Sequence, residues 1–263
     1  MSIKPYYKTN NCALYQCDNL ELMKQLPDNY IDLIYCDILY GTGRNFGNYQ
    51  DLKPERSVID DHYLIRISEM NRLLKETGKI FIHCDYHINH WIRIILDEIF
   101  EYKNFINEII WCYRGGGVSK KGFANKHDTI YCYAKDGKLS LYNPQFGEYS
   151  DASKTLVNSN DGVSIDGKER DLERGCHMND WWTDINSLQT WSPERLKYNT
   201  QKPKSLLDRI IESATKENEI VADFYMGCGT TGESAISLGR KFIGCDIGER
   251  ACKITQERLE KYA

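Results

Sequence analysis

The chain has 263 residues, of which 41% are hydrophobic and 27% are charged. This length suits one large domain, or one domain with an insertion, and the composition excludes a disordered chain or a coiled coil. The formal net charge of −4 argues against unspecific coating of nucleic acid, although a local basic face could still bind DNA. No run of about 18 apolar residues could span a membrane, and the N-terminus MSIKPYYKTNN lacks a signal peptide's apolar stretch, so we expect a cytoplasmic protein.

Strand-like and helix-like segments alternate in the first part of the chain. Short apolar runs predict buried strands, and apolar residues at helical spacing, such as Leu64, Ile67, Leu73 and Leu74, predict helices. The expected strands are 30–36, 79–83, 106–112 and 129–133, and the expected helices are 61–75 and 88–100. This alternation predicts a sheet with crossover helices.

The middle of the chain has a different character. Residues 115–122 read GGGVSKKG, which predicts a flexible basic loop, and residues 136–190 are rich in Asn, Ser, Asp and Gly with little periodicity. We expect an irregular lobe there. Regularity returns after Lys202, with expected helices 204–215, 230–238 and 249–262 and expected strands 219–224 and 241–245.

Ten cysteines raise the question of disulfides or zinc, but no CxxC pair occurs. Cys36, Cys132 and Cys245 lie inside apolar runs, where a cysteine behaves as a small buried hydrophobe. We therefore expect reduced thiols. The segment 83–90 holds several possible metal ligands without a defined ligand spacing, and we expect hydrogen-bonded or solvated side chains and no metal there.

A glycine-rich loop follows the strand expected at 219–224. Glycines at 227, 229 and 232 let the backbone approach a ligand, and the helix that follows offers free N–H groups. Asp246 ends the next expected strand, where a carboxylate can accept ribose hydroxyls. The glycines also fit the dinucleotide pattern G-x-G-x-x-G, but Asp223 just before them suits an ammonium group better than a pyrophosphate. A dehydrogenase is therefore a distant alternative.

A second motif follows the strand expected at 30–36. Asp37-Ile38-Leu39-Tyr40 places an acid and an aromatic ring at the carboxyl end of a strand, where open α/β sheets bind ligands. By itself this could be an ordinary strand end. Together with the glycine loop, it resembles the active site of an amino-methyltransferase.

With these motifs, the chain resembles the beta class of DNA methyltransferases that modify exocyclic amines of bases. Several segments match the family in order along nearly the whole chain. They are Cys17-Asp18-Asn19, residues 37–40 in the place of Asp-Pro-Pro-Tyr, 125–128 for Asn-Lys-His-Glu, 182–185, 198–203 around Thr-Gln-Lys-Pro, and 223–231 for Asp-Pro-Phe-x-Gly-Ser-Gly-Thr-Thr. Several matches that occur in the same order as in the family are far more specific than any single match.

The resemblance implies a Rossmann-like fold that depends on S-adenosylmethionine, with circularly permuted motifs and a mixed, mostly parallel sheet. Residues 1–112 would form the catalytic half, 113–195 the target-recognition region and 196–263 the cofactor half. Asp223 and the glycine loop would hold the amino-acid end of the cofactor, Lys202 its carboxylate, Asp246 its ribose and Asp18 its adenine. The implied cofactor-binding residues are Cys17, Asp18, Asn19, Lys202, Asp223, Tyr225, Gly227, Gly229, Thr230, Thr231 and Asp246.

The resemblance also assigns catalytic roles. The base must leave the DNA stack, Tyr40 would stack on it, and Asp37 with the Ile38 carbonyl would accept hydrogens of its amine. Basic and aromatic residues of two loops are implied DNA contacts, although the second loop could equally be a solvated surface. These residues are Arg44, Asn45, Phe46, Arg114, Lys120, Lys121, Lys126 and His127.

Ile38 and Leu39 depart from the family because they replace two prolines, which would stiffen the turn. Asp37 matches the branch that methylates N6 of adenine in double-stranded DNA, whereas the N4-cytosine branch usually has serine there. Three alternatives stay open: an N6-adenine enzyme, an N4-cytosine enzyme and a catalytically weak relative that binds DNA or cofactor. A homodimer and a cognate restriction endonuclease also stay open.

Overall fold

The computed structural model describes residues 3–47, 49–115, 117, 119–149, 151, 155, 173–196 and 198–262. Two compact units are present: Met1–Tyr142 with Asp180–Ala263, and Asn143–Asn179. Parts of the loop expected at 115–122 and most of 150–172 lie outside the described residues. Within the described part of the chain, no helix is both long enough and apolar enough to cross a membrane.

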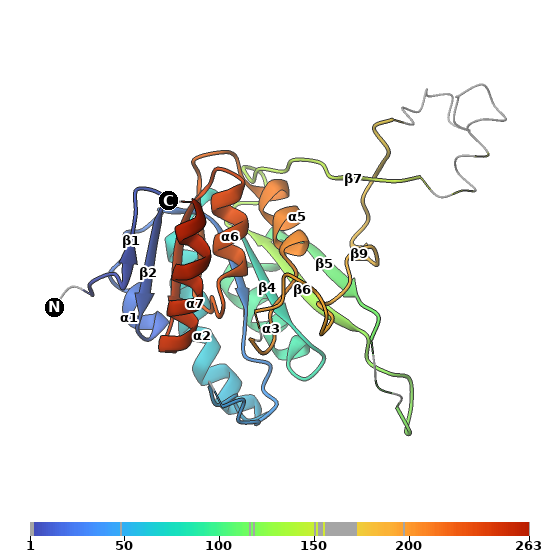
Figure 1. Ribbon diagram of the computed structural model, residues 1–263, viewed down its shortest axis with the longest axis horizontal. Coiled ribbons are helices and arrows are strands. Elements are labelled where there is room, and N and C mark those ends of the chain that lie inside the picture. The colour runs from blue at the N-terminus through green and yellow to red at the C-terminus, as the bar shows by residue number, and fades with distance from the viewer. Residues whose placement is uncertain are drawn as a thin grey trace. The chain divides into compact units, whose positions relative to one another are not determined.

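A mixed sheet forms the centre of the first unit (Figure 1). Among the described residues, nine strands follow the order β1-β2-β11-β10-β3-β4-β6-β5-β9. Their bounds are β1 Tyr7–Lys8, β2 Cys12–Gln16, β3 Ile31–Asp37, β4 Leu74–Cys84, β5 Phe105–Cys112, β6 His127–Ala134, β9 Trp181–Trp182, β10 Ile220–Asp223 and β11 Lys241–Asp246. The five strands from β2 to β4 are parallel, and β6 runs antiparallel to β4 and β5. The predicted mixed, mostly parallel sheet is confirmed.

Helices cover both faces of this sheet, as a Rossmann-like fold requires (Figure 1). One layer holds α1 (Asn19–Met23), α2 (Arg56–Leu73) and α3 (Asn89–Phe100), and the other holds α5 (Lys204–Ala214), α6 (Thr230–Ser237) and α7 (Glu249–Leu259). Short 3-10 turns cover Tyr102–Asn104 and Glu260–Tyr262. The first six residues of β3 are buried because both faces of the strand are covered.

The helix expected at 61–75 differs from α2 in its start, its end and its buried face. The helix begins at Arg56, and Leu74 already belongs to β4. Tyr63 is buried whereas Leu64 is exposed. Successive residues on a helix point about 100° apart, and the buried stripe follows Ile59, Tyr63, Ile67, Met70 and Leu73. Ile67 and Leu73 were predicted, whereas the other three were not. The short elements β1, β2 and α1 were also not predicted.

The separate unit Asn143–Asn179 is smaller than the recognition region expected at 113–195. It contains an antiparallel pair of short strands, β7 (Phe146–Gly147) and β8 (Cys176–His177). β6 falls inside the expected region but is an interior strand of the main sheet, and β9 pairs with β5 at the sheet edge. Strands β6 and β9 of the expected recognition region thus belong to the main sheet, and the division of the chain into three functional regions stays a prediction. The recognition role of the region stays a prediction.

The order of the strands brings the two halves of the chain together. β3 lies between β4 and β10, although β10 comes far later in the sequence. Because β2, β11, β10 and β3 are parallel, their carboxyl ends share one edge of the sheet. The segments that follow these strands therefore meet at that edge.

Candidate active site

A cavity of about 430 Å³ opens at the carboxyl edge of the parallel strands. This volume lies in the range of small-molecule sites. Most of the predicted site residues line it, namely Cys17, Asp18, Asn19, Asp37, Ile38, Tyr40, Phe46, Lys202, Asp223, Tyr225, Gly227, Thr230, Thr231 and Asp246. The strand order thus gathers residues from both ends of the chain around one space.

Gly229 is the exception among the predicted cofactor residues, since it does not line the cavity. It precedes α6 with a left-handed φ of 75°. A Cβ at this position would collide with the Thr255 side chain of α7. Glycine is therefore required here by the left-handed turn and by the close packing of α7 against the loop, on the side away from the cavity.

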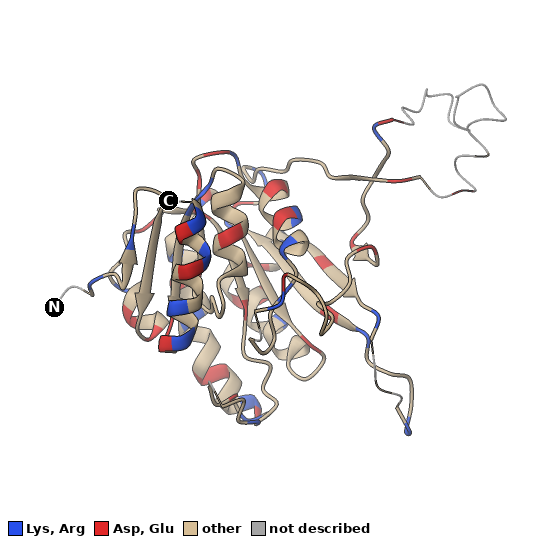
Figure 2. Ribbon diagram, viewed as in Figure 1, with Lys and Arg blue, Asp and Glu red and all other residues tan. Residues whose placement is uncertain are grey.

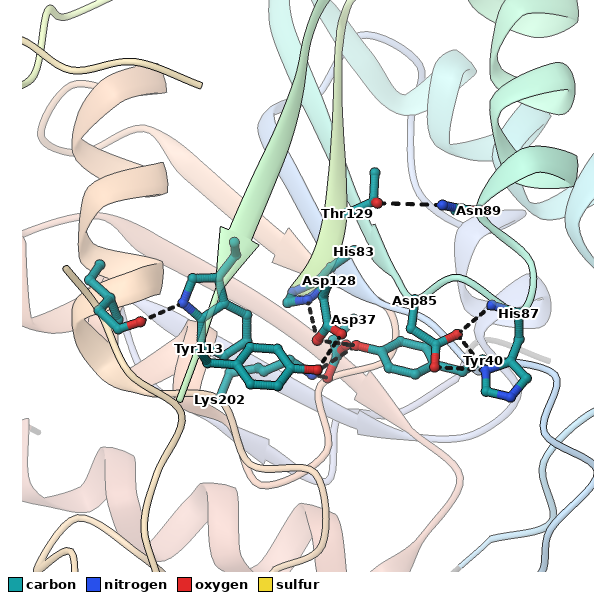
Figure 3. Close-up of polar contacts among 12 residues, drawn as sticks. Asp37, Tyr40, His83, Asp85, His87, Asn89, Tyr113, Asp128, Thr129 and Lys202 are labelled. Carbon is teal, nitrogen blue, oxygen red and sulfur yellow. Dashed lines mark hydrogen bonds and ion pairs between the residues drawn. The ribbon is translucent and has the colours of Figure 1, made fainter. Parts of the chain in front are cut away.

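Asp37, Tyr40 and Lys202 form the polar centre of the cavity (Figure 3). The Tyr40 hydroxyl donates to Asp37 Oδ1 at 2.7 Å. The Lys202 ammonium donates to Asp37 Oδ2 at 2.6 Å and to the Tyr40 hydroxyl oxygen at 3.0 Å. Lys202, which the resemblance assigns to the cofactor carboxylate, thus contacts the predicted catalytic residue Asp37.

Hydrogen bonds hold the turn that lacks the family's prolines. The Ile38 N–H donates to the His83 carbonyl at 3.1 Å, a bond that proline could not make. The Tyr63 hydroxyl donates to the Leu39 carbonyl at 2.8 Å. Just after the turn, the Asp51 carboxylate accepts the N–H groups of residues 41 and 42 at 3.1 and 2.7 Å. These contacts restrict the turn in a way that the sequence did not indicate.

A buried network lies behind Tyr40 (Figure 3). His83 Nε2 lies 3.1 Å from Asp128 Oδ2, and its Nδ1 lies 2.8 Å from the Tyr35 hydroxyl. The Tyr113 hydroxyl donates to Asp128 Oδ1 at 3.0 Å, and the Tyr40 hydroxyl lies 3.5 Å from Asp128 Oδ2. An ionised carboxylate only accepts, so Nε2 of His83 carries the proton. The sequence marked His83 only as one member of a ligand-rich segment.

Burial and charge set the protonation of this network. Burial acts to raise the pKa of Asp128, but the hydrogen bond and charge of His83, with the charge of Lys202, lower it below the ordinary value. Burial, followed by the charges of Asp37 and Asp128, raises the pKa of Tyr40 well above its ordinary range. Tyr40 therefore stays a neutral donor beside two carboxylates.

Two carboxylates shape the glycine loop. Asp223 accepts the Tyr225 N–H at 2.9 Å and the Thr231 hydroxyl at 2.6 Å, one on each oxygen. Asp246 accepts the N–H of Gly227 at 3.0 Å on one oxygen and that of residue 248 at 2.8 Å on the other. Burial raises the pKa of Asp223 to about 7, against the two bonds that it accepts. Burial also raises the pKa of Asp246.

Helix α2 contributes two cavity residues that the sequence did not indicate, Arg66 and His62. Arg66 donates to Asp18 Oδ2 at 2.9 Å and to Asn19 Oδ1 at 2.8 Å, which fixes both side chains. His62 Nε2 lies 2.9 Å from the Tyr225 hydroxyl, and burial followed by the charge of Arg66 lowers the pKa of His62 to about 4. No pattern in the helix distinguishes these two residues from other polar ones.

The expected DNA contacts fall into two groups. Phe46 lines the cavity and stacks on Tyr49 with ring centroids 5.1 Å apart, in the loop that also carries Arg44 and Asn45. The other loop, between β5 and β6, carries basic residues at its tip and near the ends of the two strands (Figure 2). Its expected contacts Arg114, Lys120, Lys121, Lys126 and His127 are exposed or partly exposed, and none of them lines the cavity.

Sequence comparison identifies the family to which this site belongs. The profile described as DNA methylase matches residues 31–257. The chain belongs to the DNA methylase family. It is 31% identical to the DNA adenine methyltransferase YhdJ of Escherichia coli (strain K12), over 92% of this chain and 81% of that protein. It is also 31% identical to the type II methyltransferase M.BamHI of Bacillus amyloliquefaciens, over 98% of this chain but only 59% of that protein.

Solved structures show that this methylase has the fold of DNA methyltransferases. The PvuII DNA methyltransferase (cytosine-N4-specific) superposes with a TM-score of 0.69 at 18% identity, over 99% of this chain and 93% of that chain. The M1.HpyAVI–SAM complex superposes with a TM-score of 0.61 at 22% identity, over 94% of this chain and 100% of that chain. These likenesses confirm the predicted Rossmann-like methyltransferase fold.

The cysteines and histidines of the methylase do not form a metal centre in the described residues. All ten cysteines are free thiols, and seven of them are buried. Within the segment 83–90, His83 joins the Asp128 network and His87 contacts Asp85 at 2.8 Å. These side chains are hydrogen-bonded.

Proposed function

We propose that this methylase transfers a methyl group from S-adenosylmethionine to the N6 amine of a flipped adenine in double-stranded DNA. One observation carries the proposal. The Asp37 carboxylate and the Tyr40 ring share a cavity with the glycine loop and Asp246, so an acceptor for an amine lies beside a set of groups suited to the cofactor.

The carboxylates of the cavity suit the proposed cofactor. S-adenosylmethionine supplies an electrophilic methyl group on a sulfonium, and it also carries an ammonium group, two ribose hydroxyls and an adenine amine. Asp223 would face the ammonium, Asp246 the ribose and Asp18 the adenine. The described hydrogen bonds use one acceptor position on each oxygen of Asp223 and Asp246, and a carboxylate has about four.

The smaller residues complete the proposed cofactor site. Cys17 and Asn19 lie beside Asp18 in the wall of the cavity, Tyr225 belongs to the loop after β10, and Thr230 and Thr231 begin α6. Arg66 would hold Asp18 and Asn19 in place through the contacts already described. Arg66 of α2 would thus hold the adenine end of the site through Asp18, and Thr231 of α6 would hold the ammonium end through Asp223.

The chain's own groups would prepare the amine for attack. An adenine amine is a weak nucleophile because its lone pair is delocalised into the ring. Asp37 and the Ile38 carbonyl would accept its hydrogens, and Tyr40 would stack on the flipped base, worth about 1–3 kcal/mol. As the nitrogen bonds to the methyl carbon it becomes cationic, and Asp37 is placed to accept the proton that it loses. Positioning at about 3–3.5 Å can supply several kcal/mol of the barrier.

Two further features support the assignment to DNA and to adenine. Asp37 matches the adenine branch of the family, and YhdJ is named a DNA adenine methyltransferase. The basic loop between β5 and β6 and the loop around Phe46 would contact phosphates and the gap left by the base. The name type II methyltransferase, carried by several relatives, favours a restriction–modification role with a cognate endonuclease.

The test is methylation of unmethylated genomic DNA by the purified protein with S-adenosylmethionine, followed by nucleoside mass spectrometry. We expect N6-methyladenine. N4-methylcytosine would keep the reaction and overturn the choice of base. No product, with the cofactor still bound in calorimetry, would mean a binding protein in place of an enzyme.

A further inference from the structure

We propose that Lys202 donates a hydrogen bond to the ring nitrogen beside the target amine, so that Asp37 and Lys202 together read one edge of the flipped base. The inference rests on the proposed function. It gives Lys202 a different ligand from the cofactor carboxylate, and it makes the lysine a residue that positions and selects the base.

The position of the Lys202 side chain is closely defined. Its ammonium contacts Asp37 and the Tyr40 hydroxyl, and all three side chains line the cavity. The neighbouring backbone is held as well, because the Gln201 side chain accepts the Leu196 N–H at 2.9 Å and donates to the Glu194 carbonyl at 2.9 Å. The side chains of Lys202 and Asp37 are only 11% and 19% exposed, so little solvent surrounds their pair.

Hydrogen-bond accounting leaves a donor beside an acceptor. A lysine ammonium has three N–H donors, and the described contacts of Lys202 use two of them. Each oxygen of Asp37 accepts one described bond and keeps capacity for another. A base with an amine next to an unprotonated ring nitrogen presents a matching donor and acceptor. N6 and N1 of adenine have this arrangement, as do N4 and N3 of cytosine, whereas thymine has no amine.

Charge explains why the ammonium would remain at this place. Asp37 and Asp128 both lie near the Tyr40 hydroxyl, and the charge of Lys202 acts on both carboxylates. If the lysine moved to a cofactor carboxylate, two partly desolvated acids would lose that countercharge. The Asp37–Lys202 pair is also neutral as a whole, so it would not repel the sulfonium or the amine that becomes cationic.

The experiment is a double-mutant cycle. It removes the lysine donor from the enzyme and the ring-nitrogen acceptor from the base, first one at a time and then together. Lys202→Met keeps the length of the side chain without its N–H groups. The substrates are duplexes carrying the methylated site found above, with adenine, 1-deazaadenine (C–H in place of N1) or 3-deazaadenine at the target. The deaza bases alter pairing and amine reactivity, but both enzymes meet the same DNA, so these effects cancel in the cycle.

For the wild-type enzyme, 1-deazaadenine should lower the single-turnover rate about 10- to 100-fold more than 3-deazaadenine does. This is the size of effect that loss of a hydrogen bond to a charged group implies. In Lys202→Met the same replacement should change the rate less than about threefold. Lys202→Arg, which keeps donors, should recover part of the coupling. Lys204→Met is the matched control, because Lys204 pairs with Asp208 outside the cavity and should behave as wild type.

Calorimetry supplies the reading that separates this role from cofactor binding. Lys202→Met should bind S-adenosylmethionine within about twofold of wild type. A large loss of cofactor affinity in Lys202→Met would overturn the role of Lys202. So would rate losses from the lysine and 1-deazaadenine replacements that are independent and therefore multiply. In either case an active wild-type enzyme would leave the proposed function intact. An inactive wild-type protein would overturn both.

Discussion

The glycine loop and the turn at 37–40 lie in the same cavity but are held by different means. In the glycine loop, Asp223 and Asp246 bind backbone N–H groups, and Gly229 fills a place where no side chain fits. In the turn at 37–40, a buried N–H of Ile38 and the hydroxyl of Tyr63 replace the stiffness of two prolines. At residue 229 of the loop only glycine fits the available space. The turn, in contrast, can be made rigid either by proline rings or by hydrogen bonds.

The largest effect is expected at Asp37, the proposed proton acceptor in the turn. Asp37→Ala should lower methyl transfer about 100- to 10,000-fold, the usual contribution of a positioned proton acceptor. Cofactor affinity should stay within about threefold, measured by calorimetry. Glu76→Ala, an exposed acid on β4, is the control and should leave the rate unchanged. Joint loss of binding and transfer in Asp37→Ala would mean that the two regions are not separable.

Restoring the family's prolines one at a time tests how the turn is held. Ile38→Pro removes the bond to the His83 carbonyl and should lower the rate about 10- to 100-fold, since small misplacements near reacting atoms are costly. Leu39→Pro should cost at most a few-fold, because the described bonds include none from the Leu39 N–H. Ile38→Val, which keeps the N–H, is the second control. A faster Ile38→Pro enzyme would contradict the hydrogen-bond account.

The buried acid of the glycine loop predicts a pH dependence of cofactor binding. Asp223 has a pKa of about 7, so it is mostly neutral at pH 5.5 and half ionised at pH 7. The cofactor ammonium stays charged over this range because such groups titrate at about 7.7–8.0. Affinity for S-adenosylmethionine should therefore rise several-fold from pH 5.5 to 7, and the rise should vanish in Asp223→Asn. Calorimetry at fixed ionic strength decides, and affinity that falls with pH would exclude an ammonium partner for Asp223.

The smallest effect concerns space in the glycine loop. Gly229→Ala should destabilise the fold by about 1–3 kcal/mol because the new methyl group meets Thr255. Each kcal/mol lowers Tm by about 2–4 °C in a chain of this size. Gly47→Ala is the matched control, with a similar φ of 81° but no neighbour within 4 Å of the added carbon. Equal shifts in calorimetric Tm would show that backbone conformation, not packing, sets the requirement.

The sequence predicted the parts of this site that follow from chain order. Asp37, Asp223 and Asp246 end strands, and parallel strands bring their carboxyl ends to one edge, so their meeting could be foreseen. The contact between Lys202 and Asp37 could not, because it joins side chains 165 residues apart whose rotamers depend on packing. Arg66 and His62 were missed for the same reason. The burial of Tyr63 in place of Leu64 shows that helical phase is decided by the sheet beneath.

The permuted strand order also sets the course of folding during synthesis. Asp32 on β3 accepts the N–H of Ile220 on β10, across 188 residues of chain. Until β10 leaves the ribosome, β3 has a partner on one side only, and β2 lacks β11. A hydrophobic sheet edge is therefore open for most of translation, which is the state in which chains aggregate or bind chaperones. Strands β10 and β11 follow the other strands of the main sheet in the chain, and both carry cavity residues, so the sheet and the cavity are completed by the same two strands.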